Sequence, residues 1–166
     1  MNQGMIHIYS GDGHGKTPAA WGEALQAASE GKEVVVIQFL KGKGLEDSSF
    51  LKRLEPEIKF FRFEKSDAEF ATLSDAHKAE EIQNIKNGLN FARKVLTTGG
   101  CDLLILDEVL GLIDVGVITV EELRSILSAK QPEVTIIMTG IQLSDEVCAL
   151  ADEVSRIDKM NFKVYA

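Results

Sequence analysis

The chain has 166 residues, of which 45% are hydrophobic and 27% charged, a balance typical of one globular domain, here residues 1–166, with a sizeable core. Its formal net charge of −8 and the lack of a basic stripe argue against nucleic acid as a partner. The longest apolar runs are too short to span a membrane, no secretory signal is visible, and Cys101 and Cys148 lack metal-ligand spacing. We therefore expect a cytoplasmic protein with reduced, mostly buried thiols.

The N-terminal part of the chain predicts a strand, a glycine-rich loop, a helix and a second strand. Residues 5–10 (MIHIYS) alternate between apolar and polar side chains, as a strand with one buried face does. The helix is predicted from Thr17 to about Glu30, because Gly31 stands in the usual position after a helix C-terminus. Residues 33–40 (EVVVIQFL) form a nearly continuous β-branched run, which is typical of a parallel strand covered on both faces.

The middle of the chain predicts a third strand, a long helix and a fourth strand. Residues 58–63 (IKFFRF) are the third strand candidate. The helix is predicted over residues 75–96, where apolar side chains recur at helical spacing: Ile82, Ile85, Leu89, Ala92 and Leu96. Residues 101–108 (CDLLILDE) predict a buried strand that ends in two acidic residues.

The C-terminal third predicts a helix, a fifth strand, a short helix and an edge strand. Thr119 and Glu122 have the spacing of a capping box at a helix start. Residues 133–140 (EVTIIMTG) predict the fifth strand. Ser144 is a candidate cap for the short last helix, and residues 153–160 (EVSRIDKM) are the candidate edge strand.

Strands thus alternate with helices, which predicts a three-layer α/β fold with a mostly parallel sheet. Ligands of such folds bind at the carboxyl ends of the strands. Four polar segments follow predicted strands: the glycine-rich loop, QFLKG, LDE and TG. Because the carboxyl ends of parallel strands meet at one edge of the sheet, we expect these four segments to form one site.

The glycine-rich loop, SGDGHGKTP, is close to the Walker A phosphate-binding pattern. Lys16 and Thr17 complete that pattern, although Ser10 stands where its leading glycine belongs. Alternating glycines let successive backbone N–H groups face an anion, and the following helix adds the positive end of its dipole. The alternative interpretation is a glycine-rich turn that only joins a strand to a helix. The predicted nucleotide-binding residues are Gly11, Asp12, Gly13, His14, Gly15, Lys16, Thr17, Pro18 and Gln38.

Two carboxylates follow the fourth strand in a Walker B-like arrangement. Asp107 and Glu108 come directly after the apolar run LLIL, and either carboxylate can hold Mg²⁺ or its water shell. An acidic turn after a core strand is the alternative, but the glycine-rich loop favours a metal site. The predicted metal ligands are Thr17, Asp107 and Glu108.

Polar and aromatic residues follow the second and third strands. Gln38 and Lys41 lie near the expected ligand edge, although a surface role is the default for such side chains. Core packing accounts for the three phenylalanines of IKFFRF, whereas Phe70 stands among charged residues and is harder to place in a core. The segment 65–75 has mixed charge and few apolar residues, and it predicts a mobile loop near the site.

Taken together, these segments resemble the P-loop corrinoid adenosyltransferases, which act on cob(I)alamin and cob(I)yrinic acid a,c-diamide. The similar segments are SGDGHGKTPAA, VVVIQFLKG, LLILDE and the TG that precedes ADEVSRI. Ser10 is normal in the loop of this family, and QFLKG is the most specific match because ordinary P-loop proteins have no reason to carry it. The similarity runs from about Ile6 to about Ile157.

The resemblance implies a P-loop NTPase (RecA-like) fold, a homodimer, and attack of Co(I) on the 5′ carbon of ATP with displacement of triphosphate. A protein that catalyses this reaction supplies proximity and charge stabilisation rather than a general base. In this family ATP lies reversed in the loop, compared with ordinary P-loop NTPases. The implied partners are ATP, Mg²⁺, a reduced corrinoid and a reductase that delivers electrons to cobalt. The implied roles are catalysis for Lys16, Thr17 and Glu108, metal binding for Asp107 or Glu108, and proximity to the corrinoid for Lys41 and Phe70.

Four positions depart from the family pattern. Pro18 replaces a second threonine and His14 replaces a lysine in the loop, while Gln26 and Ile141 replace arginines. Three positive charges near the triphosphate are therefore lost, or conditional in the case of His14. Two alternatives follow: a nucleotide- or corrinoid-binding paralogue without turnover, and an ordinary P-loop ATPase or kinase.

Overall fold

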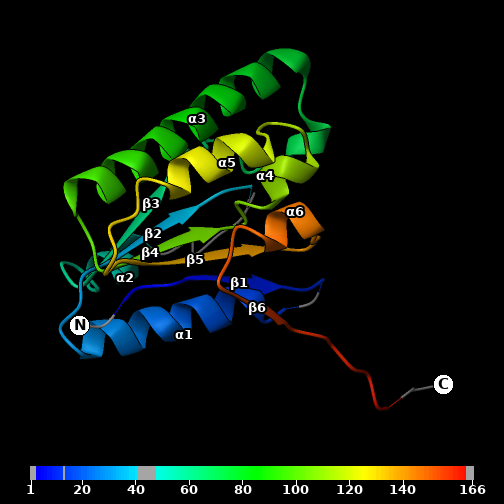
Figure 1. The fold of residues 1–166 in the computed structure, drawn as a ribbon. Coiled ribbons are helices and arrows are strands. Elements are labelled where there is room, and N and C mark those ends of the chain that lie inside the picture. The colour runs from blue at the N-terminus through cyan, green and yellow to red at the C-terminus, as the bar shows by residue number, and fades with distance from the viewer. Residues whose placement is uncertain (1–2, 13, 41–47, 164–166) are drawn as a thin grey trace.

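The computed structural model describes residues 3–12, 14–40 and 48–163. Within them, six strands form one sheet in the order β3-β2-β4-β5-β1-β6, and every neighbouring pair is parallel (Figure 1). The strands are β1 (Ile6–Ser10), β2 (Val34–Gln38), β3 (Ile58–Arg62), β4 (Leu103–Asp107), β5 (Thr135–Gly140) and β6 (Glu153–Arg156). The predicted parallel α/β fold and the predicted edge strand are both confirmed, and the strands end up to four residues inside the predicted bounds.

The burial of each strand follows from its place in the sheet. Every residue of β2 and β4 is buried, because these neighbouring strands lie inside the sheet with helices over both faces. β6, by contrast, lies at an edge and has no buried residue. The continuous apolar runs in the sequence therefore mark the central strands, as parallel packing requires.

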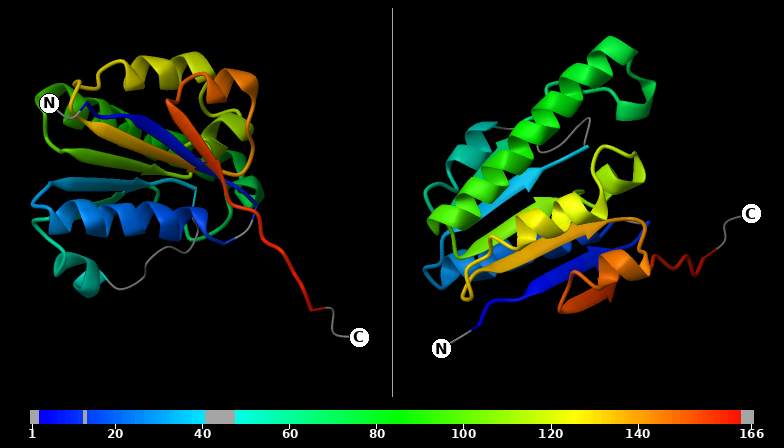
Figure 2. Two further views of the ribbon diagram at one scale, coloured as in Figure 1. Left: turned by 60° about the horizontal axis from the view of Figure 1, so that its bottom comes forward. Right: turned by 45° about the horizontal axis from the view of Figure 1, so that its top comes forward.

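Helices cover the sheet on both sides (Figures 1 and 2). One face is covered by α1, and the other by α3 and α5, so that two apolar cores form. The helices of the described residues are α1 (Lys16–Ser29), α2 (Ser48–Lys52), α3 (Asp75–Thr98), α4 (Gly111–Asp114), α5 (Val120–Leu127) and α6 (Asp145–Cys148), with a 3₁₀ turn, η1 (Phe70–Thr72). The short helices α2 and α4 and the turn η1 carry too little periodicity to be predicted from sequence.

Hydroxyl caps fix where several helices begin. The side chain of Thr119 accepts a hydrogen bond from the backbone N–H of Glu122 at 3.1 Å, and Ser144 accepts one from Val147 at 3.2 Å. Both caps are as predicted. Gly31, just beyond α1, has φ +82°, a left-handed conformation that glycine adopts without a Cβ clash.

All six strands run in one direction, so their carboxyl ends lie at the same edge of the sheet. The N-termini of α1 and α3 point to this edge as well (Figure 1). The fold therefore brings the segments after β1, β2, β4 and β5 together, as the sequence predicts. None of the helices in the described ranges is long and apolar enough to cross a membrane.

Candidate functional site

The loop between β1 and α1 is held against the chain that follows β6. Gly11 has φ +145°, and a Cβ on it would lie 2.2 Å from the carbonyl oxygen of Ile157. A Cβ on Gly15 would lie 2.9 Å from Cγ2 of Ile157. Ile157 is fixed in turn, because its N–H donates to the carbonyl of Ser10 at 2.8 Å. Close packing therefore favours glycine at both positions, and at Gly11 the left-handed backbone favours it as well.

The lysine of the loop is paired with a carboxylate of the β4 end. Lys16 Nζ lies 2.8 Å from Glu108 Oε1, and their side chains are only 11% and 13% exposed. Lys16 begins α1, so its ammonium lies where the loop and the helix N-terminus open at the sheet edge. The two charges of this ion pair are mostly shielded from solvent. Each of them can therefore interact strongly with a charged ligand that binds beside the pair.

Asp107 receives hydrogen bonds from three different elements. Its Oδ1 accepts from the hydroxyls of Thr17 at 2.9 Å and Thr139 at 2.7 Å, and its Oδ2 accepts from Gln38 Nε2 at 3.5 Å. Asp107 is 1% exposed, so this buried carboxylate depends on these partners. The four side chains come from the ends of β2, β4 and β5 and the start of α1.

Thr139 joins the two acids. Its fully buried hydroxyl donates to Asp107 and accepts from the backbone N–H of Glu108 at 2.7 Å. Sequence reasoning assigned Thr139 no role, although the TG segment at the end of the fifth strand marked its place. One hydroxyl therefore orients one carboxylate directly and the other through its backbone.

Two residues at this edge have left-handed backbones despite their side chains. Glu108 has φ +61° and Leu40 has φ +56°. Such conformations cost about 1–3 kcal/mol each and concentrate at functional sites. Both are secured by side-chain acceptors, since the N–H of Glu108 donates to Thr139 and that of Leu40 donates to Glu64 Oε1 at 2.8 Å.

The polar atoms at this edge suit a hard cation. Gln38 Oε1 belongs to the Asp107 cluster, is buried and lacks a hydrogen-bond partner among the described residues. Ser10 Oγ is also buried without a partner there, but Ser10 lies on the same face of β1 as Ile8, which packs in the core under α3 and α5 and not with the cluster. Hydroxyl, amide and carboxylate oxygens are the donors that Mg²⁺ prefers. In the described part of the chain no three His, Cys, Asp or Glu residues converge as a metal cage.

The predicted site residues thus fall into three groups. Gln38, Lys16, Thr17, Asp107 and Glu108 come together in the cluster described above. Gly11 and Gly15 form the loop beside it, and Asp12, His14 and Pro18 are exposed. Gly13 and Lys41 lie outside the described residues.

The aromatic residues of β3 and of the segment after it divide as the sequence predicts. Phe60 stacks on Trp21, and Phe61 and Phe63 pack on Phe91. Phe70 lies apart from them in the turn η1, half-buried, with Lys78 Nζ 5.8 Å from its ring centre. The segment that carries Phe70 is a loop at the carboxyl edge (Figure 1), but it contains the turn η1 and is tied to α3 by hydrogen bonds, a feature the sequence did not predict.

Residues 2–165 match the family model described as ATP:corrinoid adenosyltransferase BtuR/CobO/CobP. The chain belongs to this family. It is 31% identical over 156 residues to the corrinoid adenosyltransferase CobA of Salmonella typhimurium, covering 93% of this chain and 76% of that protein. It is 29% identical over 155 residues to the corrinoid adenosyltransferase of Escherichia coli K12, with the same coverage. The resemblance found in the motifs is thereby confirmed.

The fold is also similar to that of a solved structure. A KaiC-like protein of Pyrococcus horikoshii superposes with a TM-score of 0.60, covering 97% of this chain and 76% of that chain. The two sequences are 19% identical, so this likeness concerns the fold. The adenosyltransferase chain thus has a P-loop NTPase fold of the RecA-like type, as the resemblance implied.

Proposed function

We propose that this protein is an ATP:corrinoid adenosyltransferase that transfers the 5′-deoxyadenosyl group of ATP to Co(I) of cobalamin or cobyrinic acid a,c-diamide. The observation that carries the proposal is the cluster of Lys16, Thr17, Asp107 and Glu108 at the carboxyl edge of the sheet, in a chain of this family. A phosphate-binding lysine and two ordered carboxylates are the groups needed to hold a nucleotide triphosphate and its metal.

The transfer needs no protein nucleophile. The electron pair of Co(I) forms the cobalt–carbon bond, the bond between the 5′ carbon and its oxygen breaks, and its electron pair leaves on triphosphate. Cobalt is thereby oxidised formally to Co(III). The protein contributes by aligning the 5′ carbon with cobalt and by stabilising the negative charge that grows on the leaving oxygen.

Lys16 and the loop amides are the groups that stabilise the leaving triphosphate. Lys16 is paired with Glu108, so binding of a phosphate oxygen brings a second anion to the same ammonium. Charge-assisted hydrogen bonds to phosphate are stronger than neutral ones, and the dipole of α1 favours an anion at its N-terminus. The close packing of Ile157 on Gly11 and Gly15 holds these two positions of the phosphate loop in place.

Thr17, Asp107 and Glu108 are the proposed residues of the Mg²⁺ site. Asp107 and Thr17 already share a hydrogen bond of 2.9 Å, and Thr139 orients both acids. Mg²⁺ would neutralise part of the triphosphate charge. Gln38, with its unpartnered Oε1, is proposed to accept a hydrogen bond from the bound nucleotide or its water shell.

The corrinoid is proposed to bind on the Phe70 side of the same edge. Phe70 is half-buried in the turn η1, and Lys41, the other proposed contact, follows the left-handed Leu40 in the chain. Two further parts of the proposal rest on length, composition and cysteine usage: one nucleotide-binding domain over residues 1–166 and a cytoplasmic location. The homodimer and the separate reductase that supplies electrons to cobalt rest on the family resemblance.

Product analysis tests this function. The protein is incubated with ATP, Mg²⁺ and a chemically reduced corrinoid, and the phosphate products are separated. Triphosphate formed together with adenosylated corrinoid supports the proposal. ADP would instead indicate an ordinary P-loop ATPase or kinase, and binding of ATP and corrinoid without any product would indicate a non-catalytic paralogue.

A further inference from the structure

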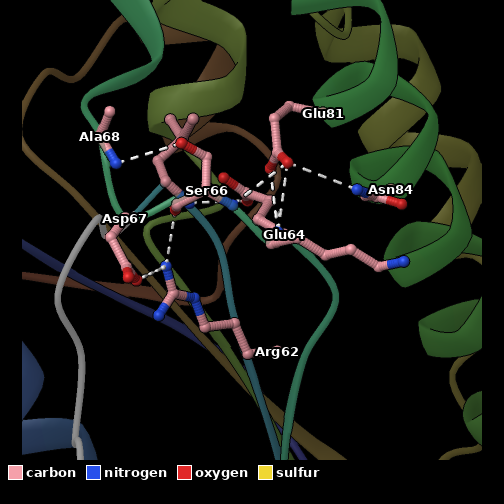
Figure 3. A network of polar contacts seen from close by, with 9 residues as sticks. Arg62, Glu64, Ser66, Asp67, Ala68, Glu81 and Asn84 are labelled. Carbon is pink, nitrogen blue, oxygen red and sulfur yellow. Dashed lines mark hydrogen bonds and ion pairs between the residues drawn. The ribbon is translucent and has the colours of Figure 1, made fainter. Parts of the chain in front are cut away.

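The chain that leaves β3 is held by a buried carboxylate of α3 (Figure 3). Glu81 accepts hydrogen bonds from the backbone N–H of Lys65 at 3.2 Å and of Ser66 at 3.2 Å. Two successive N–H groups thus point at one carboxylate, as they do in an anion-binding turn. The hydrogen bonds join residues fifteen and sixteen positions apart, so they fix the loop to the helix.

Glu81 is unusual because it is 6% exposed on a helix that packs in the core. A buried carboxylate is costly unless hydrogen bonds compensate for lost hydration. Asn84 Nδ2, one turn along α3, adds a further contact to Glu81 Oε1 at 3.4 Å. The carboxylate thus has a built set of donors, and the helix that carries it is anchored by Ile85 and Leu89 beside it.

A second carboxylate, that of Glu64, links this loop to the chain that follows β2. Glu64 lies next to Lys65 and accepts the N–H of Leu40, whose backbone is left-handed. Burial raises the pKa of Glu64 above its ordinary value, and the negative charge of Glu81 raises it further. The exit of β2, the exit of β3 and α3 are therefore joined through two neighbouring carboxyl groups.

The arginine that ends β3 closes the loop from its other side. Arg62 Nη2 donates to the carbonyl of Ser66 at 3.0 Å and lies 3.7 Å from Asp67 Oδ1 (Figure 3). Ser66 is consequently fixed at both its N–H and its carbonyl. Only three residues separate it from Phe70, which lines one narrow recess with Leu40, Glu64, Ser66, Leu73 and Glu81.

We propose that Glu81 is a positioning residue that holds the Lys65–Ser66 backbone and thereby sets Phe70 for corrinoid binding. The corrinoid part rests on the proposed function, whereas the backbone contacts do not. Glu81 lies on α3 and makes no hydrogen bond to Lys16, Thr17 or Asp107 among the described contacts. Replacing Glu81 should therefore impair the use of the corrinoid and leave ATP binding unchanged.

Amide hydrogen exchange tests the anchor without any corrinoid. In Glu81→Ala, exchange at the Lys65 and Ser66 amides should accelerate about tenfold or more, because each loses a hydrogen bond to a charged acceptor. Glu81→Gln keeps one acceptor oxygen and should give a smaller increase, which keeps the test valid if the alanine variant folds poorly. Glu80→Ala, an exposed carboxylate on the same turn of α3, is the matched control and should leave both amides unchanged. Unchanged exchange in Glu81→Ala would overturn the anchor.

Steady-state kinetics test the link to the corrinoid. Relative to the Glu80→Ala control, Glu81→Ala should lower kcat/KM for the corrinoid about tenfold and leave the ATP affinity from calorimetry unchanged. If Glu81 had a purely structural role, Glu81→Ala would lower kcat/KM for the corrinoid, the affinity for ATP and the thermal stability together. Equal losses for ATP and corrinoid, or an unchanged kcat/KM alongside faster amide exchange, would contradict the positioning role. If the unmodified protein forms no adenosylated corrinoid, the proposed function fails, and the exchange measurement still decides whether Glu81 anchors the loop.

Discussion

At the scale of single residues, the site is ordered by hydroxyl groups as much as by charges. Thr17 and Thr139 both donate to one oxygen of Asp107, and Thr139 also accepts the N–H of the left-handed Glu108. These contacts lie within the protein itself and hold both acids in one orientation. This kind of preorganisation is what allows fixed dipoles and charges to stabilise a transition state.

Lys16→Ala should weaken ATP binding by about tenfold or more, because it removes a charge-assisted hydrogen bond to phosphate. Titration calorimetry with ATP and Mg²⁺ measures the effect. Lys32→Ala is the control, since Lys32 is exposed just beyond the far end of α1 and pairs with Glu30. An ATP affinity in Lys16→Ala equal to that of the control would show that the loop does not hold the phosphates.

Thr139→Val should lower the free energy of unfolding by about 1–3 kcal/mol, because it leaves the Glu108 N–H and one Asp107 contact without a partner in a buried place. Adenosyl transfer should fall as well, since both acids lose their orientation. Thr139→Ser keeps the hydroxyl and should retain most of the activity. Denaturant unfolding and initial rates measure the two effects. A valine variant as active as the serine variant would refute the role given to this hydroxyl.

Pro18 lies in the first turn of α1, where its missing N–H costs the helix nothing but removes a donor from the phosphate loop. Pro18→Thr should therefore tighten ATP binding by about tenfold, with little change in thermal stability. Pro18→Ala restores the N–H alone and separates its contribution from that of the hydroxyl. Affinity that is equal or poorer in both variants, measured at one salt concentration, would mean that the loop satisfies the phosphate by another donor.

At the scale of elements, the periodicity of the sequence determines the strands and long helices but not the contacts between them. The runs VVVIQ and LLILD predict buried central strands because both faces of each must be covered, and the hydroxyl caps of α5 and α6 follow from residue type. Glu81 could not be predicted, since a glutamate on a helix is normally solvated, and its backbone partners are fifteen and sixteen residues away. Thr139 was missed for a similar reason: its two contacts come from a strand far along the chain.

Glu64 makes the junction of β2, β3 and α3 sensitive to pH. Burial is the main cause of its raised pKa, Glu81 adds to it, and the Leu40 N–H and Arg62 oppose it. The native state therefore binds the proton of Glu64 more tightly than the unfolded state does. The protonated carboxyl group stabilises the native state fully below its ordinary pKa of 4.5, and this contribution is lost as pH rises through the raised pKa. Glu64→Gln, which is neutral at every pH, should be more stable than the unmodified protein near neutral pH.

Thermal unfolding of both proteins across the acidic to neutral range measures this difference. The gap in stability should shrink as pH falls below the raised pKa and should be smallest below 4.5, where Glu64 is protonated in both states. Glu80→Gln, on the exposed side of α3, should show no such dependence. A constant gap across the range would show that Glu64 does not titrate with a raised pKa in the native protein.

At the scale of the whole molecule, the parallel sheet explains why residues far apart in sequence form one site. The segments after β1, β2, β4 and β5 meet at a single edge, and the N-termini of α1 and α3 open onto it (Figure 1). The sequence predicts this edge of the sheet. It also predicts that the glycine-rich loop, the two acids Asp107 and Glu108, and Gln38 lie there, because each stands at the end of a recognisable strand. It predicts the chemistry only through the family resemblance, since an ATPase would need a similar loop and similar acids.

The central claim is that the 5′ carbon of ATP, rather than its γ-phosphate, is the reacting atom. The most direct test is to supply ATP labelled isotopically at the 5′ carbon, together with Mg²⁺ and chemically reduced corrinoid, and to follow the label. We predict that the label becomes bonded to cobalt in the same amount as triphosphate is released, and that Lys16→Ala slows both. Label that remains in ADP or AMP while phosphate is released, or that remains in bound ATP beside reduced corrinoid, would contradict the claim.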